Sequence, residues 1–130
     1  MAALANPTAV VVVTDGPVPD ARVTPFVDAL REVAGSQHAI ADDVPVIAGD
    51  WTREGVEAAF DEAYATQPDL VLALGTGAST VALSGGDAAV PTVAPWVLDP
   101  VLQGWTGEAP ANVHPVRVHL GLQGLAQTLR

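Results

Sequence analysis

Continuous apolar runs alternate with amphipathic segments along most of the chain. Ala9–Val13 and Leu70–Leu74 are aliphatic without polar alternation, which is typical of strands buried on both faces. The first run stops at Thr14-Asp15-Gly16-Pro17, and the second stops at Gly75-Thr76-Gly77-Ala78-Ser79-Thr80. Glycine permits tight turns and close approach of the backbone, so these breaks predict loops at the ends of two buried strands.

The amphipathic segments predict helices. Thr24-Pro25 predicts a helix start with proline in the first helical position, and Gly35 predicts its end. Its expected apolar stripe consists of Phe26, Leu30, Val33 and Ala34. The clearest helix begins at Asp50 or Thr52 and has apolar residues at i, i+3, i+4, i+7 and i+8. These residues are Val56, Ala59, Phe60, Ala63 and Tyr64.

The remaining elements are marked by shorter patterns. Either His38-Ala39-Ile40 or Val44–Ile47 forms the second strand, and Pro45 would place the latter near a sheet edge. A short helix is predicted from Ala78 to Leu83, and a short strand from Val90 to Ala94 before a loop that begins at Pro95-Trp96. An edge strand over Val116–Leu120 and a final helix complete the pattern. The final helix is indicated by Leu122, Leu125, Ala126 and Leu129.

The alternation of strands and helices predicts the fold class. Such a pattern implies right-handed crossovers and a mainly parallel sheet with helices on both faces. We therefore expect residues 1–130 to form a single α/β domain, a three-layer α/β/α sandwich of the flavodoxin-like or Rossmann-like type. Ligands of such sheets bind beyond the C-terminal ends of the strands. In this chain that edge comprises Thr14-Asp15-Gly16, Gly75–Ser79 and Pro95-Trp96.

Composition narrows the functional classes. Hydrophobic residues make up 49% of the chain and charged residues 15%, which indicates a folded domain. The net charge of -10, with five arginines and no lysine, provides no basic stripe for nucleic acid. The absence of cysteine excludes disulfides and thiolate metal sites. His38, His114 and His119 lack metal-ligand spacing, so neither a metal nor a cofactor is expected.

Several catalytic motifs match only in part. Gly75-Thr76-Gly77 lacks the third glycine of a dinucleotide fingerprint, and a lysine-free chain excludes a P-loop. Gly77–Val81 lacks the last glycine of a nucleophile elbow, although Ser79, Asp99 and His114 or His119 occur in α/β-hydrolase order. A small serine hydrolase using Ser79, Asp99 and His114 therefore remains an alternative. A structural or oligomerisation module is a further alternative function.

Three segments carry a resemblance to a known family. They are Gly49-Asp50-Trp51-Thr52-Arg53-Glu54-Gly55-Val56, then Asp69–Gly75 with Ala78-Ser79, and then Pro91–Asp99 with Leu102-Gln103-Gly104. In this order they resemble the N-terminal lobe of ABC-transporter-type substrate-binding proteins, of the periplasmic-binding-protein-like class I group, including relatives associated with outer-membrane efflux systems. The resemblance implies a lobe that binds a small molecule and closes on a second lobe of the same parent protein.

The resemblance also implies a cellular role. The ligand would pass to a membrane transport or efflux complex without chemistry, and the parent protein would be periplasmic or in the cell envelope. The chain contains no apolar stretch of membrane-spanning length, and its start lacks the basic region of a signal peptide. We therefore expect the chain to be a mature or trimmed form if the natural protein is exported.

Four residues fall where such a lobe presents ligand contacts: Asp15, Thr76, Ser79 and Trp96. Asp15 could accept a hydrogen bond from an amine, and the two hydroxyls could bind a carboxylate with help from the helix N-terminus. Trp96 could cover an apolar part of the ligand. The leading hypothesis is a non-catalytic solute-binding lobe. An apolar strand-end face, if left exposed, would instead favour a homodimer.

Overall fold

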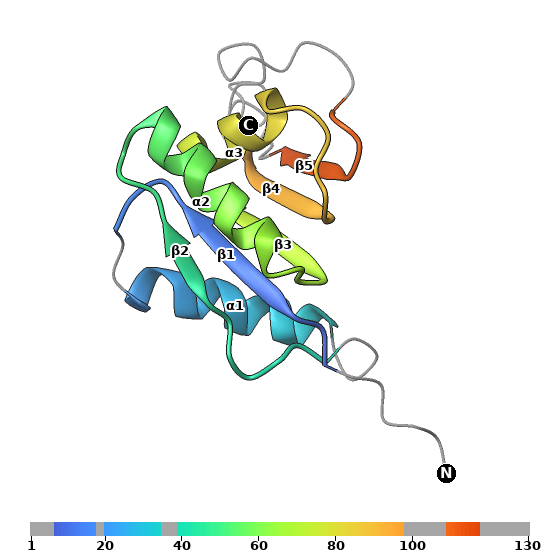
Figure 1. The fold of residues 1–130 in the computed structure, drawn as a ribbon. Helices are drawn as coiled ribbons and strands as arrows, with labels where there is room; N and C mark the ends of the chain where they lie inside the picture. Colours follow the sequence, from blue (N-terminus) through green and yellow to red (C-terminus); the bar gives the residue numbers. More distant parts are fainter. Residues whose placement is uncertain (1–6, 18–19, 35–38, 98–108, 118–130) are drawn as a thin grey trace, which may run out of the picture.

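The computed structural model describes residues 7–17, 20–34, 39–97 and 109–117, which form a parallel β-sheet with helices on both faces (Figure 1). The strands are β1 (Val10–Thr14), β2 (Val46–Ala48), β3 (Leu70–Leu74), β4 (Thr92–Val97) and β5 (Val113–Arg117). The helices are α1 (Asp20–Ala34), α2 (Arg53–Ala65) and α3 (Thr76–Ser84). The strand order is β2-β1-β3-β4-β5, and all neighbouring strands run parallel. This confirms the predicted flavodoxin-like or Rossmann-like α/β class.

Each central strand sends alternate side chains into two separate hydrophobic clusters. Val11 and Val13 of β1 pack with α2 and α3, together with Val71 and Ala73 of β3. On the opposite face, Val10, Val12 and Leu72 pack with Val23 and Val27 of α1. All five residues of β1 are buried, as expected of a strand covered on both sides. This double coverage explains why the apolar runs lack alternation.

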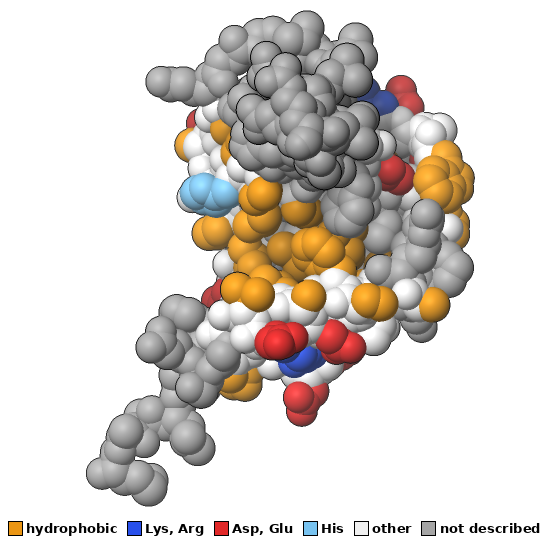
Figure 2. Space-filling model, turned by 180° about the vertical axis from the view of Figure 1, so that it is seen from behind, with side chains coloured by type: hydrophobic (Ala, Val, Ile, Leu, Met, Phe, Trp, Pro, Cys, Tyr) orange, Lys and Arg blue, Asp and Glu red, His pale blue; other side chains and the backbone are white. Residues whose placement is uncertain are grey.

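The face that carries α1 is apolar beyond the helix as well. Seen from behind, hydrophobic side chains form a band across the sheet beside α1 (Figure 2). The register places Val93 of β4 opposite Leu72 of β3 and His114 of β5, so these residues share this face. Val116, two residues after His114, lies on the same face and is 51% exposed. Within the described ranges, no helix covers this end of the sheet.

The first helix differs from the prediction in where it begins and in which residues near its two ends are buried. α1 begins at Asp20, so Pro25 lies inside the helix and not at its first position. The earlier start adds Val23 to the buried stripe, and this burial favours an extra helical turn. Val33, predicted to pack inward, is 86% exposed. Gly35, the predicted stop, directly follows the last residue of α1.

The strand boundaries also required correction. The second strand is Val46–Ala48 at the sheet edge, while Ile40 makes only an isolated bridge with Thr8. Pro95 and Trp96 lie within β4, and the predicted loop start there was wrong. The ladder with β5 shifts register between Ala94 and Val97, and such an irregularity accommodates a proline that cannot donate to the ladder.

The two remaining C-terminal predictions had different outcomes. β5 begins at Val113, three residues before the predicted start, because Val113 is itself buried against the core. It is an edge strand, as predicted. The helix predicted from the stripe that starts at Leu122 lies outside the described residues.

Candidate functional site

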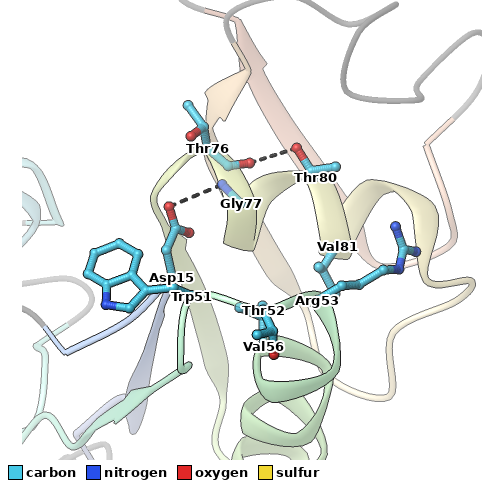
Figure 3. Close-up of a pocket in the computed structure, with 9 residues that line it drawn as sticks. All are labelled: Asp15, Trp51, Thr52, Arg53, Val56, Thr76, Gly77, Thr80 and Val81. Atoms are coloured by element: carbon cyan, nitrogen blue, oxygen red, sulfur yellow. Dashed lines mark hydrogen bonds between the residues drawn. The ribbon is translucent and has the colours of Figure 1, made fainter.

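The strand order creates a reversal point between β1 and β3. From β1 the chain first moves outward to β2, and it then returns to the other side of β1 for β3 and continues to β4 and β5. The connections on the two sides of such a point diverge and leave a crevice beyond the strand ends, where open α/β sheets bind ligands. A pocket of about 370 Å³ occupies this position (Figure 3). It is lined by Asp15, Trp51, Thr52, Arg53, Val56, Thr76, Gly77, Thr80 and Val81.

Asp15 connects the end of β1 to the start of α3. Its carboxylate accepts hydrogen bonds from the backbone N–H of Gly77 at 3.2 Å and from that of Ala78. These N–H groups belong to the first turn of α3, where no helical carbonyl is available to them. Gly75, the residue before the helix, provides no side-chain cap. Asp15 therefore takes the role of a helix cap across 62 residues of sequence.

Trp51 forms one wall of the pocket and is largely exposed. Its side chain is 65% accessible, and its backbone has a φ of 67°, which is unusual for a bulky residue. The backbone N–H of Trp51 donates to the carbonyl of Asp15 at 2.9 Å. The indole lies over Gly16, since a Cβ on Gly16 would be only 2.2 Å from Cε2 of the ring. The glycine after Asp15 therefore creates the space that the indole occupies.

The N-terminus of α2 forms the floor of the site. Thr52 is the N-cap, and its hydroxyl accepts from the N–H of Gly55 at 3.0 Å. The Asp50 carboxylate accepts from the backbone N–H of Thr52 at 3.0 Å and also from its hydroxyl. These hydrogen bonds, first the one from the Thr52 hydroxyl, lower the pKa of Asp50 below its usual 3.8. The ionised carboxylate thus holds the cap in place.

We expect the substitution Asp50→Ala to produce a pH-dependent loss of stability. Because the pKa of Asp50 is lowered in the folded state, its contribution is present above about pH 3.8 and is lost as the pH falls below that value. The variant should therefore be less stable than the parent at neutral pH, and the difference should narrow in acid. Urea unfolding across a pH series measures this difference, and a constant difference would contradict the assignment.

Arg53 is the cation of the pocket lining, and its guanidinium has other partners. Nε donates to Glu57 at 2.8 Å, forming an ion pair within α2, and Nη2 donates to the hydroxyl of Ser84 at 2.9 Å. In Figure 3 the side chain extends away from Asp15. The positive charge is therefore directed mainly at α2 and the end of α3, not at the Asp15 side of the pocket.

The four residues predicted to bind ligand have different environments. Asp15 and Thr76 line the pocket together, although they are 61 positions apart in the chain. Ser79 is fully buried, and its hydroxyl donates to the carbonyl of Ala73 at 3.2 Å, so it lies beneath the site and not in its wall. Trp96 lies in β4, and its side chain lies outside the described part of the structure.

Of the residues of the hydrolase alternative, the structure describes Ser79 and His114, which lie on different elements and are not brought together. Ser79 is buried, and His114 is exposed on β5 at the far edge of the sheet. Asp99 and His119 lie outside the described residues. A serine with no accessible hydroxyl is poorly placed for attack on a substrate.

The four predicted ligand contacts do not include Trp51 or Thr80, which also line the pocket. Tryptophan is mostly buried on average, yet Trp51 lies between Gly49-Asp50 and a helix cap, in a polar loop. That polar neighbourhood was the available signal. Thr80 lies one turn after Thr76, and its hydroxyl donates to the Thr76 carbonyl at 2.7 Å. Residues at this spacing share a helix face, so both reach the pocket.

In residues 7–17, 20–34, 39–97 and 109–117, no group of three or more histidine or acidic side chains is arranged to hold a metal ion. Among the helices of these same ranges, none is both long and apolar enough to cross a membrane.

Comparison with known proteins gave no match to a family model, a curated protein or a solved structure.

Proposed function

We propose that the chain is a non-catalytic domain that binds a small organic molecule in the pocket between the ends of β1 and β3. The observation that carries the proposal is the position of this pocket at the reversal point of a parallel sheet. Its volume of about 370 Å³ lies in the range of small-molecule sites. The lining combines an exposed indole, a carboxylate and threonine hydroxyls, which are groups that stack on ligands and hydrogen-bond to them.

The chemistry of the lining supports binding over catalysis. Its described members include Asp15 and three threonines, but no histidine or cysteine that could serve as a base or nucleophile. Ser79, the nucleophile of the alternative hypothesis, is buried outside the lining. Because Asp15 caps α3 and the Thr80 hydroxyl donates to the Thr76 carbonyl, the lining is suited to recognition.

The resemblance to substrate-binding proteins of ABC transporters gives this proposal a cellular form. In that form the chain is the N-terminal lobe of a periplasmic or cell-envelope protein. A second lobe closes over the pocket, and the ligand passes to a membrane transport or efflux complex. The C-terminal ends of β1 and β3, where the pocket opens, form the side on which the chain would contact the second lobe.

A blocking substitution tests the site. We expect binders from a panel of amino acids, monosaccharides and aromatic amines to shift the backbone amide signals of Asp15, Trp51 and Gly77 together in NMR spectra. Thr80→Phe fills the pocket and should weaken those binders at least tenfold, about 1.4 kcal/mol of binding free energy. Thr24→Phe adds the same ring to an exposed position of α1 and should leave affinity unchanged.

Two outcomes would overturn the proposal. In the first, the panel contains binders, but their shifts map to residues away from the pocket. In the second, Thr80→Phe binds as tightly as the parent chain while its spectrum shows a folded domain.

A further inference from the structure

We propose that the ligand is an organic cation, an amine attached to a flat apolar group, with the ammonium at Asp15 and the apolar group on Trp51. This inference rests on the proposed function of the same pocket. It names the chemical class that the pocket selects, and it excludes the ligand carboxylate that was predicted from the sequence at the Thr76 and Ser79 hydroxyls.

The N-terminus of α3 is already occupied by the Asp15 carboxylate. A ligand carboxylate would need the N–H groups of the first turn, and those of Gly77 and Ala78 already donate to Asp15. A helix N-terminus carries roughly half a positive elementary charge, whereas the carboxylate carries a full negative charge. Their sum is negative, so the pocket attracts cations and repels anions.

The Asp15 carboxylate can accept further hydrogen bonds beyond those from α3. A carboxylate has about four acceptor positions, and the two backbone N–H groups use two of them. Asp15 also lines the cavity, so part of its surface faces the ligand space (Figure 3). An ammonium group donates three hydrogen bonds and accepts none, which matches a carboxylate whose other side is already capped.

The charged groups around the pocket also favour a cation over an anion. The Arg53 guanidinium is paired with Glu57 and bonded to Ser84, so it provides little attraction for an anion at Asp15. Asp50, which precedes the pocket residue Trp51 in the chain, is hydrogen-bonded to the pocket residue Thr52. The chain as a whole has a net charge of -10, and its field raises the local concentration of cations.

Trp51 has an unusual backbone conformation and is largely exposed. An indole that is 65% exposed on a backbone with φ of 67° is held in a costly arrangement without the compensation of burial. Such strain is concentrated at ligand sites, where it fixes a side chain in advance of binding. The indole lies over Gly16, next to Asp15. An aromatic face beside a carboxylate suits a cation through both ion pairing and the cation–π interaction.

Three small probes of similar shape and different charge provide the test. They are 2-phenylethylamine, 2-phenylethanol and 3-phenylpropionate, titrated into the full chain while the indole N–H signal of Trp51 is followed by NMR. The Trp51→Phe variant assigns that signal among the three tryptophans. We expect the amine to bind about tenfold more tightly than the alcohol and the propionate to leave the Trp51 signal unmoved.

Paired variants with the same change in net charge test the role of Asp15. Asp15→Asn keeps an oxygen acceptor for α3 but removes the charge, and should weaken the amine about tenfold while leaving the alcohol unchanged. Asp28→Asn removes one charge from an exposed position on α1, across the sheet, and should change amine affinity less than twofold. Equal losses in both variants would show that only net charge matters and would overturn the assignment to Asp15.

The outcomes separate this inference from the proposed function. If the propionate binds at Trp51 as tightly as the amine, the cation preference is wrong while the pocket remains a binding site. If no probe moves the Trp51 signal but sugars of the wider panel do, the cation inference is again wrong. If no member of the panel shifts pocket residues and binders map elsewhere, both fail.

Discussion

Replacing Gly75 by alanine should destabilise the domain by about 3 kcal/mol, the largest stability effect that we expect from a single substitution at the site. Gly75 has φ 129° and ψ 159°, a backbone region accessible essentially to glycine alone. A Cβ at this position would also lie 2.4 Å from Oδ1 of Asp15. The cost thus combines backbone strain with displacement of the carboxylate that caps α3. Urea or thermal unfolding, followed by circular dichroism, measures it.

A second glycine separates the two contributions. Gly86 also has a positive φ, 85°, but a Cβ there would meet no atom within 4 Å. Gly86→Ala should therefore show only the backbone cost, about 1 kcal/mol. If Gly75→Ala and Gly86→Ala destabilise the chain equally, close packing of Gly75 against Asp15 does not contribute.

Removing the Asp15 side chain should destabilise the domain by about 2 kcal/mol and reverse the charge preference of the pocket. In Asp15→Ala the N–H groups of Gly77 and Ala78 lose their acceptor, which costs the variant its helix cap. The freed N-terminus of α3 should then accept an anion. Sulfate should consequently raise the Tm of the variant more than that of the parent chain, relative to chloride at matched ionic strength.

The two substitutions should also be strongly coupled. In the Asp15→Ala background the alanine at position 75 no longer meets a carboxylate, so its cost should fall toward that of Gly86→Ala. Simple addition of the two losses would contradict a shared contact. An equal response of parent and Asp15→Ala to sulfate would mean that Asp15 does not occupy the anion position of α3.

Some elements have the positions that the sequence predicts, and others do not. The strand over Leu70–Leu74 and the helix capped by Thr52 have the predicted positions, because burial on both faces and a helical period each leave a local pattern. The start of α1 was missed because Pro25 is a strong local signal that burial of Val23 outweighs. The prediction that a loop begins at Pro95-Trp96 was wrong, because pairing with β5 extends β4 through a register irregularity.

By itself the sequence determined the fold class and two segments of the site, since strand ends and glycine-rich breaks are encoded locally. Asp15 and Thr76 were predicted from those breaks, and both line the pocket. Only the tertiary structure decided that Asp15 caps α3, that Ser79 points into the core and that Trp51 stands exposed beside them. These facts depend on contacts between residues far apart in the chain. No local periodicity specifies which carboxylate will reach which helix end, and the ligand preference that we propose for the pocket rests on that contact.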